Sequence, residues 1–377
     1  MKGKQGLVCM GLLLVLSSCH TGKQITASGL QRKDFQTEVN GQHTDLFTLS
    51  NKQGMEVCIT NYGARVVSIL VPDRNGKRED VVCGFSTITE YMEQRQNFGS
   101  TVGRYIGRIL NSRFTLDGVE YKLVPNNGKS GHISHGGNPG FADRIWKVEQ
   151  ADTHTVRLSY LSPDGENGFP GNLKVTLVYS LGEDDNALDL TYEATTDAPT
   201  VLNLSHHSFF NISGDFTKSV EDQQLWVDAD RFTPYDDKKC VTGEYLPVAG
   251  TPLDFRMPHT IGEYIDADYP QLKVVNGYDH TWELNTKGDD TRPAAWVYDP
   301  ASGRKMEIFT TEPGMQIYTG NGLKGKMTGK GGIAYPFRSA VCFETMHFQD
   351  SPNQPGFPST VLRPGEVFRS HTVYKFE

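Results

Sequence analysis

Short apolar runs alternate with turn signals along almost the whole chain. Within the runs, apolar and β-branched residues recur at every second position, and Asn-Gly, Asp-Gly or Pro-Gly pairs separate one run from the next. The clearest runs are residues 55–63, 65–73, 154–165, 173–181, 187–196 and 305–311. Helical periodicity is scarce, and only residues 88–95 have the pattern of a short helix. The pattern predicts one all-β domain over residues 35–377, a large antiparallel β-sandwich.

The first residues have the pattern of a processing signal. Two lysines precede an apolar run over residues 7–16, which is shorter than the ~20 residues of a membrane-spanning helix. The run ends in Leu16-Ser17-Ser18-Cys19, which resembles a bacterial lipobox, although an ordinary secretory signal is the alternative. We expect residues 1–18 to be a lipoprotein signal peptide, with lipid on Cys19 and a polar tether over residues 19–34. This predicts a lipid-anchored protein of the bacterial cell envelope, facing the periplasm.

Composition narrows the classes of partner. The formal net charge of −8, without a long block of Lys or Arg, argues against nucleic acid or an anionic membrane surface as the main partner. Four cysteines follow Cys19, and none are paired at metal-ligand spacing, so we expect no metal site. Three of the four lie in apolar runs, which favours buried thiols, although the pattern leaves a disulfide open. The sequence predicts no particular oligomeric state.

A carboxylate lies inside an apolar strand near the end of the chain. Alternation over residues 341–346 places Val341 and Phe343 on one face, and Cys342, Glu344 and Met346 on the other. Burying a carboxylate is costly unless something compensates for it or uses it. A proline-rich loop follows directly and cannot continue a sheet ladder. A salt bridge at the strand end is the simplest interpretation of Glu344 taken alone.

A histidine pair marks a second centre. Alternation over residues 200–213 places His207 on a face with polar residues, whereas His206 shares the opposite face with leucines. The apolar face is the natural core face, so we expect His206 to be a buried core histidine. His207 is therefore the better candidate for acid–base chemistry.

Four further polar residues stand out in turn-rich segments. Arg108 lies in a block with two other arginines, and His135 precedes two glycines that allow close approach of a ligand. Asp279 opens a strand, and Gln316 lies in another. Taken singly, surface charge, an exposed loop histidine and a turn aspartate are the ordinary interpretations. A Gly-rich stretch at residues 320–326 is not a phosphate-binding loop, because the next residue is Met and no helix follows.

Several of these segments, in order, resemble the aldose 1-epimerase (galactose mutarotase) family. The resemblance spans roughly residues 35–377 and includes the stretches around Arg108, His135, His207, Asp279 and Glu344. It implies a catalytic Glu344 and His207, and sugar contacts from Arg108, His135, Asp279 and Gln316. Two departures are visible: Gly107 and His206 each stand where the family usually has Asn.

The resemblance implies interconversion of the anomers of a free aldose. One acid–base pair suffices for this reaction, because the anomeric hydroxyl loses a proton while the ring oxygen gains one. We expect Glu344 as base and His207 as acid on opposite sides of a single sugar ring, without cofactor or metal. A glycoside hydrolase using Asp279 and Glu344, and a non-catalytic sugar-binding lipoprotein, are the two alternatives.

Overall fold

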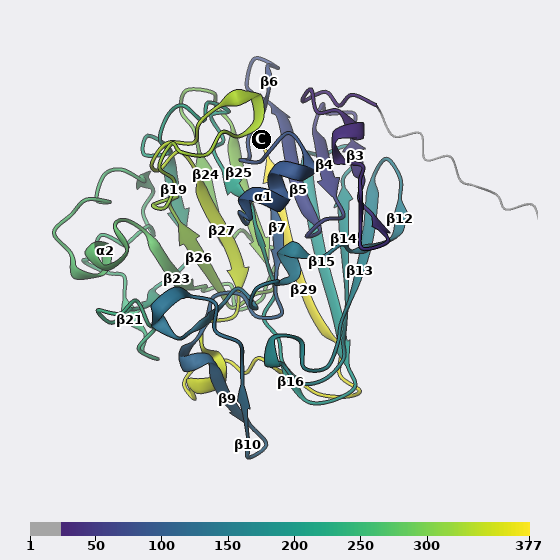
Figure 1. Cartoon of the computed structure of the whole chain (residues 1–377). Helices are drawn as coiled ribbons and strands as arrows, with labels where there is room; N and C mark the ends of the chain where they lie inside the picture. The colour runs from purple at the N-terminus through teal and green to yellow at the C-terminus, as the bar shows by residue number, and fades with distance from the viewer. Residues whose placement is uncertain (1–23) are drawn as a thin grey trace, which may run out of the picture.

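The computed structural model describes residues 24–377. In this part of the chain, every pairing between named strands is antiparallel. Strands dominate, and the two α-helices are short (Figure 1). The predicted all-β architecture is therefore confirmed. The described residues contain no helix long and apolar enough to cross a bilayer.

The largest sheet has nine strands. Its spatial order is β12 (Lys147–Ala151), β13 (Thr155–Ser162), β14 (Leu173–Leu181), β15 (Ala187–Thr196), β29 (Phe368–Phe376), β25 (Lys305–Thr310), β24 (Ala295–Tyr298), β19 (Gln224–Val227) and β22 (His259–Thr260). Along β14, buried positions alternate with exposed or half-buried ones, as expected for a strand with one face on the core. The C-terminal strand β29 lies between β15 and β25, so it joins segments that are far apart in the sequence.

Two further sheets complete the main body. The six-stranded sheet runs β18 (Phe209–Phe210), β27 (Val341–Met346), β26 (Gly314–Tyr318), β23 (Asp279–Glu283), β20 (Arg231–Thr233) and β21 (Leu246–Pro247). The four-stranded sheet runs β3 (Leu46–Ser50), β4 (Glu56–Thr60), β5 (Arg65–Pro72) and β6 (Arg78–Asp80). One continuous core joins all three sheets, with residues such as Ile69, Leu190 and Phe343.

The remaining elements are short. Two-stranded pairs are β1 (Glu38–Val39) with β2 (Gln42–His43), β7 (Ser100–Val102) with β17 (Ser205–His207), β8 (Arg108–Ile109) with β11 (Ile133–Ser134), β9 (Arg113–Leu116) with β10 (Val119–Lys122), and β16 (Thr200–Val201) with β28 (Val361–Leu362). The helices are α1 (Ile88–Gln94) and α2 (Pro270–Val275), and the 3-10 turns are Arg32–Phe35, Leu110–Ser112, Gly128–Ser130, Phe141–Asp143, Glu166–Gly168, Lys330–Gly332 and Ser351–Asn353. Helix α1 begins where predicted because Thr87 and Glu90 form a capping box.

The segment before residue 35 corrects one prediction. Residues 19–34 were expected to form a tether, but residues 24–34 pack on the domain: Thr26 and Leu30 are buried, and the Ala27 amide donates to Glu56 Oε1 at 2.6 Å. The expectation rested on the absence of apolar periodicity, whereas hydrogen bonds and one buried apolar side chain, Leu30, hold this segment. The predicted signal peptide over residues 1–18 and the predicted lipidation at Cys19 lie outside the described residues.

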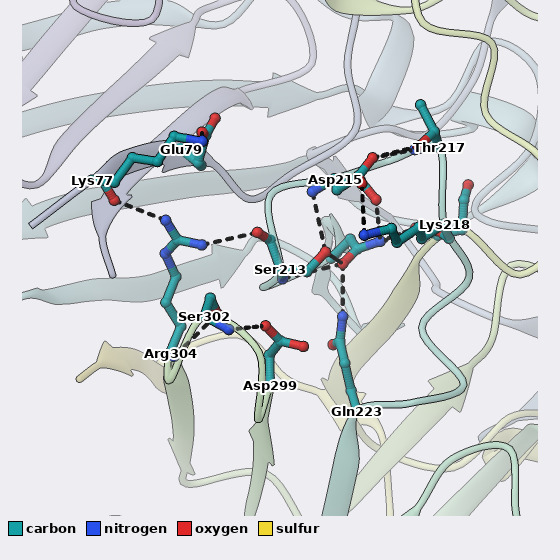
Figure 2. A network of polar contacts seen from close by, with 12 residues as sticks. Lys77, Glu79, Ser213, Asp215, Thr217, Lys218, Gln223, Asp299, Ser302 and Arg304 are labelled. Carbon is teal, nitrogen blue, oxygen red and sulfur yellow. Dashed lines mark hydrogen bonds and ion pairs between the residues drawn. The ribbon is translucent and has the colours of Figure 1, made fainter. Parts of the chain in front are cut away.

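A buried arginine joins three turns beside the sandwich (Figure 2). The Arg304 guanidinium donates to the carbonyls of Lys77 and Ser213 at 2.9 and 3.0 Å. In the same loop, Asp215 Oδ1 accepts from the amide and the hydroxyl of Thr217. Because this loop follows β18 directly, the network fixes the chain just beyond the histidine pair.

Candidate active site

A cavity of about 250 Å³ opens on one face of the six-stranded sheet. It brings together all six of the residues that the sequence singled out, and they come from six separated segments: Arg108, His135, His207, Asp279, Gln316 and Glu344. Most of the side chains in its wall are polar. Such a lining suits a small polyol better than an apolar ligand.

Three adjacent strands form the floor of the cavity. Gln316 on β26 lies directly between Thr281 on β23 and Glu344 on β27. Its Nε2 donates to Asp279 Oδ1 at 2.6 Å, and its Oε1 accepts from the Thr281 hydroxyl at 2.5 Å. Both faces of β27 are buried, because Val341 and Phe343 face the core while Glu344 and Met346 face the cavity. This is the parity predicted from the sequence.

The pairing of β8 with β11 brings Arg108 and His135 to the same wall. The His135 amide donates to the Gly107 carbonyl at 2.9 Å, and His135 adopts a left-handed backbone with φ 51°. The next residue must be glycine, because a Cβ at Gly136 would lie 1.9 Å from the Gly103 carbonyl oxygen. His135 and Gly136 therefore form a backbone turn that places the His135 imidazole in the cavity.

His207 and Glu344 contact each other directly. The distance from His207 Nε2 to Glu344 Oε1 is 3.3 Å, and their side chains are 7% and 5% exposed. The imidazole of His207 stacks on Phe209, with ring centroids 5.0 Å apart, and meets the His135 ring edge-on at 5.7 Å. Aromatic packing on two sides thus fixes the ring beside the carboxylate.

This contact corrects the expected arrangement of the pair. A sugar ring was expected to lie between Glu344 and His207, but 3.3 Å leaves no room for one. The anomeric hydroxyl and the ring oxygen of an aldose are bonded to the same carbon. An acid and a base that serve these two oxygens can therefore lie side by side and face the sugar from one direction.

Burial disfavours charge on both members of the pair. Desolvation raises the pKa of Glu344 well above its usual value, and the nearby Asp279 carboxylate adds to this shift. Desolvation also lowers the pKa of His207 well below its usual value, and His135 contributes in the same direction. Their contact favours opposite charges, so the pair is best described as holding one proton that either residue can carry.

The other ionisable groups of the cavity are arranged around this pair. Burial, with the Arg108 charge, lowers the pKa of His135 to about 4, so this imidazole is neutral at neutral pH. Burial raises the pKa of Asp279, against the opposing effects of Arg108 and Gln316. Arg108 also donates from Nη1 to the Lys239 carbonyl at 3.2 Å. The cavity thus offers one fixed cation, one carboxylate and neutral hydrogen-bonding groups.

Gln349 is a part of the site that the sequence did not indicate. Its Oε1 accepts from the Arg108 amide at 3.2 Å, and its Nε2 donates to the Tyr235 hydroxyl at 2.7 Å. It occupies the space that a side chain at position 107 would need, because a Cβ on Gly107 would lie 2.5 Å from Gln349 Cγ. Gln349 therefore fills the space into which a side chain at position 107 would project.

Two polar residues next to the site residues in the sequence, His206 and Arg104, have structural roles. His206 is buried in the core, and its Nε2 lies 2.6 Å from the Ser208 hydroxyl, which confirms its assignment as a core histidine. Arg104 is buried and donates to the carbonyls of Pro170 and Gly171 at 2.7 and 3.0 Å. Cysteines 58, 83, 240 and 342 are all free and buried.

Comparison with known proteins identifies the same family that the resemblance around the cavity residues indicates. The family model for aldose 1-epimerase matches residues 45–375. The chain is 40% identical to galactose mutarotase from Bos taurus, over 88% of this chain and 93% of the bovine protein. It is 36% identical to aldose 1-epimerase from Escherichia coli strain K12, over 89% of this chain and 96% of that protein.

Solved structures show the same fold. An aldose epimerase homologue from C. elegans superimposes with a TM-score of 0.81 at 31% identity, covering 89% of this chain and 99% of the nematode chain. Galactose 1-epimerase from Lactobacillus acidophilus NCFM gives a TM-score of 0.78 at 28% identity, covering 90% of this chain and 96% of that chain. The chain belongs to the aldose 1-epimerase family.

Proposed function

We propose that Glu344 and His207 interconvert the α and β anomers of a free hexose by acid–base catalysis. The activity follows from the family: this chain is an aldose 1-epimerase, an isomerase, with mutarotase relatives that align over most of its length. The assignment of the two residues rests on one observation. They form a buried pair, 3.3 Å apart, on the wall of a polar cavity.

The reaction conserves the charge of the pair. In the reactive form, Glu344 is a carboxylate and His207 is an imidazolium. Glu344 takes the proton of the anomeric hydroxyl, the bond from the anomeric carbon to the ring oxygen breaks, and the ring oxygen takes the proton of His207. The open aldehyde rotates and closes on its other face, while both protons return. Because burial disfavours both charges, the site stabilises the neutral pair that accompanies the open-chain sugar.

The remaining polar groups orient the sugar. Asp279 accepts from vicinal hydroxyls, and Gln316 holds its carboxylate at 2.6 Å. The Arg108 guanidinium and the neutral His135 donate from the wall formed by β8 and β11. Positioning the anomeric carbon against the pair also lowers the barrier, because it makes the proton transfers intramolecular.

Polarimetry or NMR on freshly dissolved α-glucose and α-galactose tests the function. Purified protein is expected to speed the approach to anomeric equilibrium above the buffer rate, without added metal or nucleotide. Failure across a panel of common aldoses contradicts the proposal. Sugar binding without acceleration would instead indicate a binding protein, and release of sugar from an aryl glycoside would indicate a hydrolase.

The start of the chain supports a lipid anchor. The sequence Leu16-Ser17-Ser18-Cys19 after an apolar run favours lipidation of Cys19, which would hold the enzyme at the bacterial cell envelope, facing the periplasm. Cell fractionation tests this. The natural chain is expected in the membrane fraction, and Cys19→Ala is expected to lose the lipid by mass spectrometry. An unmodified Cys19 in the purified natural protein contradicts the anchor.

A further inference from the structure

Cys342 lies next to the proposed acid–base pair, although the sequence did not link it to any site. It is two residues before Glu344 on the same face of β27, and it pairs across the sheet with Phe209 on β18 and Tyr318 on β26. Ligand atoms of His207, Cys342 and Glu344 all lie within 4.8 Å of one another. Among the described residues, this is the one group of three or more His, Cys, Asp or Glu side chains with such spacing.

We propose that His207, Cys342 and Glu344 form an inhibitory binding site for a thiophilic divalent cation of the Zn²⁺ or Cd²⁺ kind. An imidazole nitrogen, a thiolate and a carboxylate oxygen are the three ligand types that Zn²⁺ takes from proteins. They come from separated positions in the sequence, so cysteine spacing does not reveal the site. His207 and Glu344 also line the cavity, which leaves a fourth position for water, as in open zinc sites.

The distances suit such an ion. Nitrogen and oxygen ligands bound tetrahedrally at about 2.0–2.1 Å from Zn²⁺ lie about 3.3–3.4 Å apart. His207 Nε2 and Glu344 Oε1 are already 3.3 Å apart. A thiolate at about 2.3 Å from the ion lies about 3.6 Å from each of the other ligands, so a shift on the order of 1 Å at the side-chain tips completes the set.

Occupancy of this site blocks the proposed reaction. A bound cation takes the lone pair of His207 and the carboxylate oxygen of Glu344, so neither can exchange a proton with a sugar. The binding of the ion itself does not depend on the proposed function, whereas its inhibitory effect does. A direct binding measurement therefore separates failure of the site from failure of the function.

The test uses the purified chain without an affinity tag, in a buffer that does not chelate metals. Cd²⁺ binding is followed by the ultraviolet absorption of the Cd²⁺–thiolate bond, and Zn²⁺ inhibition by polarimetry. One Cd²⁺ per chain is expected to give the absorption band. Zn²⁺ is expected to inhibit reversibly, in competition with the hexose, and a chelator is expected to restore activity. Mg²⁺, which prefers oxygen ligands, is expected to have no effect.

The variant Cys342→Ser is the decisive test of the metal site, because it removes the proposed thiolate ligand. It is expected to lose the absorption band and to need at least about 10–100-fold more Zn²⁺ for half inhibition, since even outer-shell changes cost that much affinity. Cys240→Ser is the matched control, because Cys240 Sγ lies 3.2 Å from His132 Nε2 and offers another thiol–imidazole pair. It is expected to keep both signals.

Three results overturn the site: an unchanged band in Cys342→Ser, a band that disappears in Cys240→Ser, or absence of the band in the natural chain. If Cys342→Ser does not fold, as judged by its thermal melt, Cd²⁺ binding to Glu344→Gln tests the site instead. The amide is a poorer ligand than the carboxylate, so weaker Cd²⁺ absorption is expected at equal metal. Undiminished Cd²⁺ affinity in that variant contradicts the site.

Discussion

Replacement of Gln349 by alanine tests whether sugar binding in the cavity depends on a residue that lies outside the strands of the cavity floor. Gln349 accepts from the Arg108 amide at 3.2 Å and donates to the Tyr235 hydroxyl at 2.7 Å. Loss of a buried partner costs about 1–3 kcal/mol when the remaining groups are imperfectly satisfied. If that cost falls on sugar positioning, kcat/KM decreases about 5–150-fold, because about 1.4 kcal/mol corresponds to tenfold. We expect most of this change to appear as an increase in KM, with little change in kcat, because Gln349 does not contact the acid–base pair.

Initial rates of mutarotation by polarimetry, corrected for the spontaneous reaction, measure this decrease. Gln354→Ala is the matched control: it lies in the same loop, and its Nε2 donates to Asp350 Oδ2 at 2.8 Å, away from the cavity. It is expected to keep normal kinetics. Urea unfolding of both variants separates loss of fold from loss of function. A kcat/KM within twofold of the natural enzyme in folded Gln349→Ala refutes the reasoning.

Three other predictions follow from the same structure. Gly107→Ala places a Cβ at φ +75° and 2.5 Å from Gln349 Cγ, so it is expected to cost about 1 kcal/mol in urea unfolding and to raise KM; unchanged values for both contradict this. Arg104→Met leaves buried carbonyls without their donor and is expected to lower the free energy of unfolding by about 3 kcal/mol, whereas Arg113→Met, at an exposed position, is expected to change it little. Two aspartate side chains raise the pKa of His371 from 6.5 to about 9. The raised pKa means that this stabilisation is complete below pH 6.5 and is lost as the pH rises through 9. The difference in unfolding free energy between the natural protein and His371→Gln is thus expected to decrease by about 1 kcal/mol across that range, after allowance for solvent screening, and a constant difference contradicts it.

Strand parity was enough to predict much of the site. The alternation at residues 341–346 separated Val341 and Phe343, which face the core, from Glu344, which faces the cavity. The same argument distinguished His207 from His206. A period of two assigns a face to a residue without any knowledge of the partner strands. The family resemblance added Arg108, His135, Asp279 and Gln316, which parity alone did not select.

The features that the sequence did not show depend on contacts between distant segments. Gln349 lies beyond the end of β27, where alternation no longer applies, and its role depends on the space left by Gly107. The proximity of Cys342 to His207 depends on the packing of β17 beside β27. Residues 24–34 pack through hydrogen bonds and one buried leucine, Leu30, which together leave no periodic signal. The 3.3 Å contact of the acid–base pair is likewise a property of sheet packing.

The most direct test of the proposed mechanism is a double-mutant comparison of Glu344→Gln and His207→Asn. If the two residues act as one proton-sharing pair, each single variant is expected to lose about 10²–10⁴-fold in kcat, and the double variant little more. Glu312 and His347 are the matched control, a Glu–His pair 2.7 Å apart and outside the cavity, whose variants are expected to keep normal kcat. Independent, multiplicative losses, or normal kcat in either single variant, would contradict the mechanism.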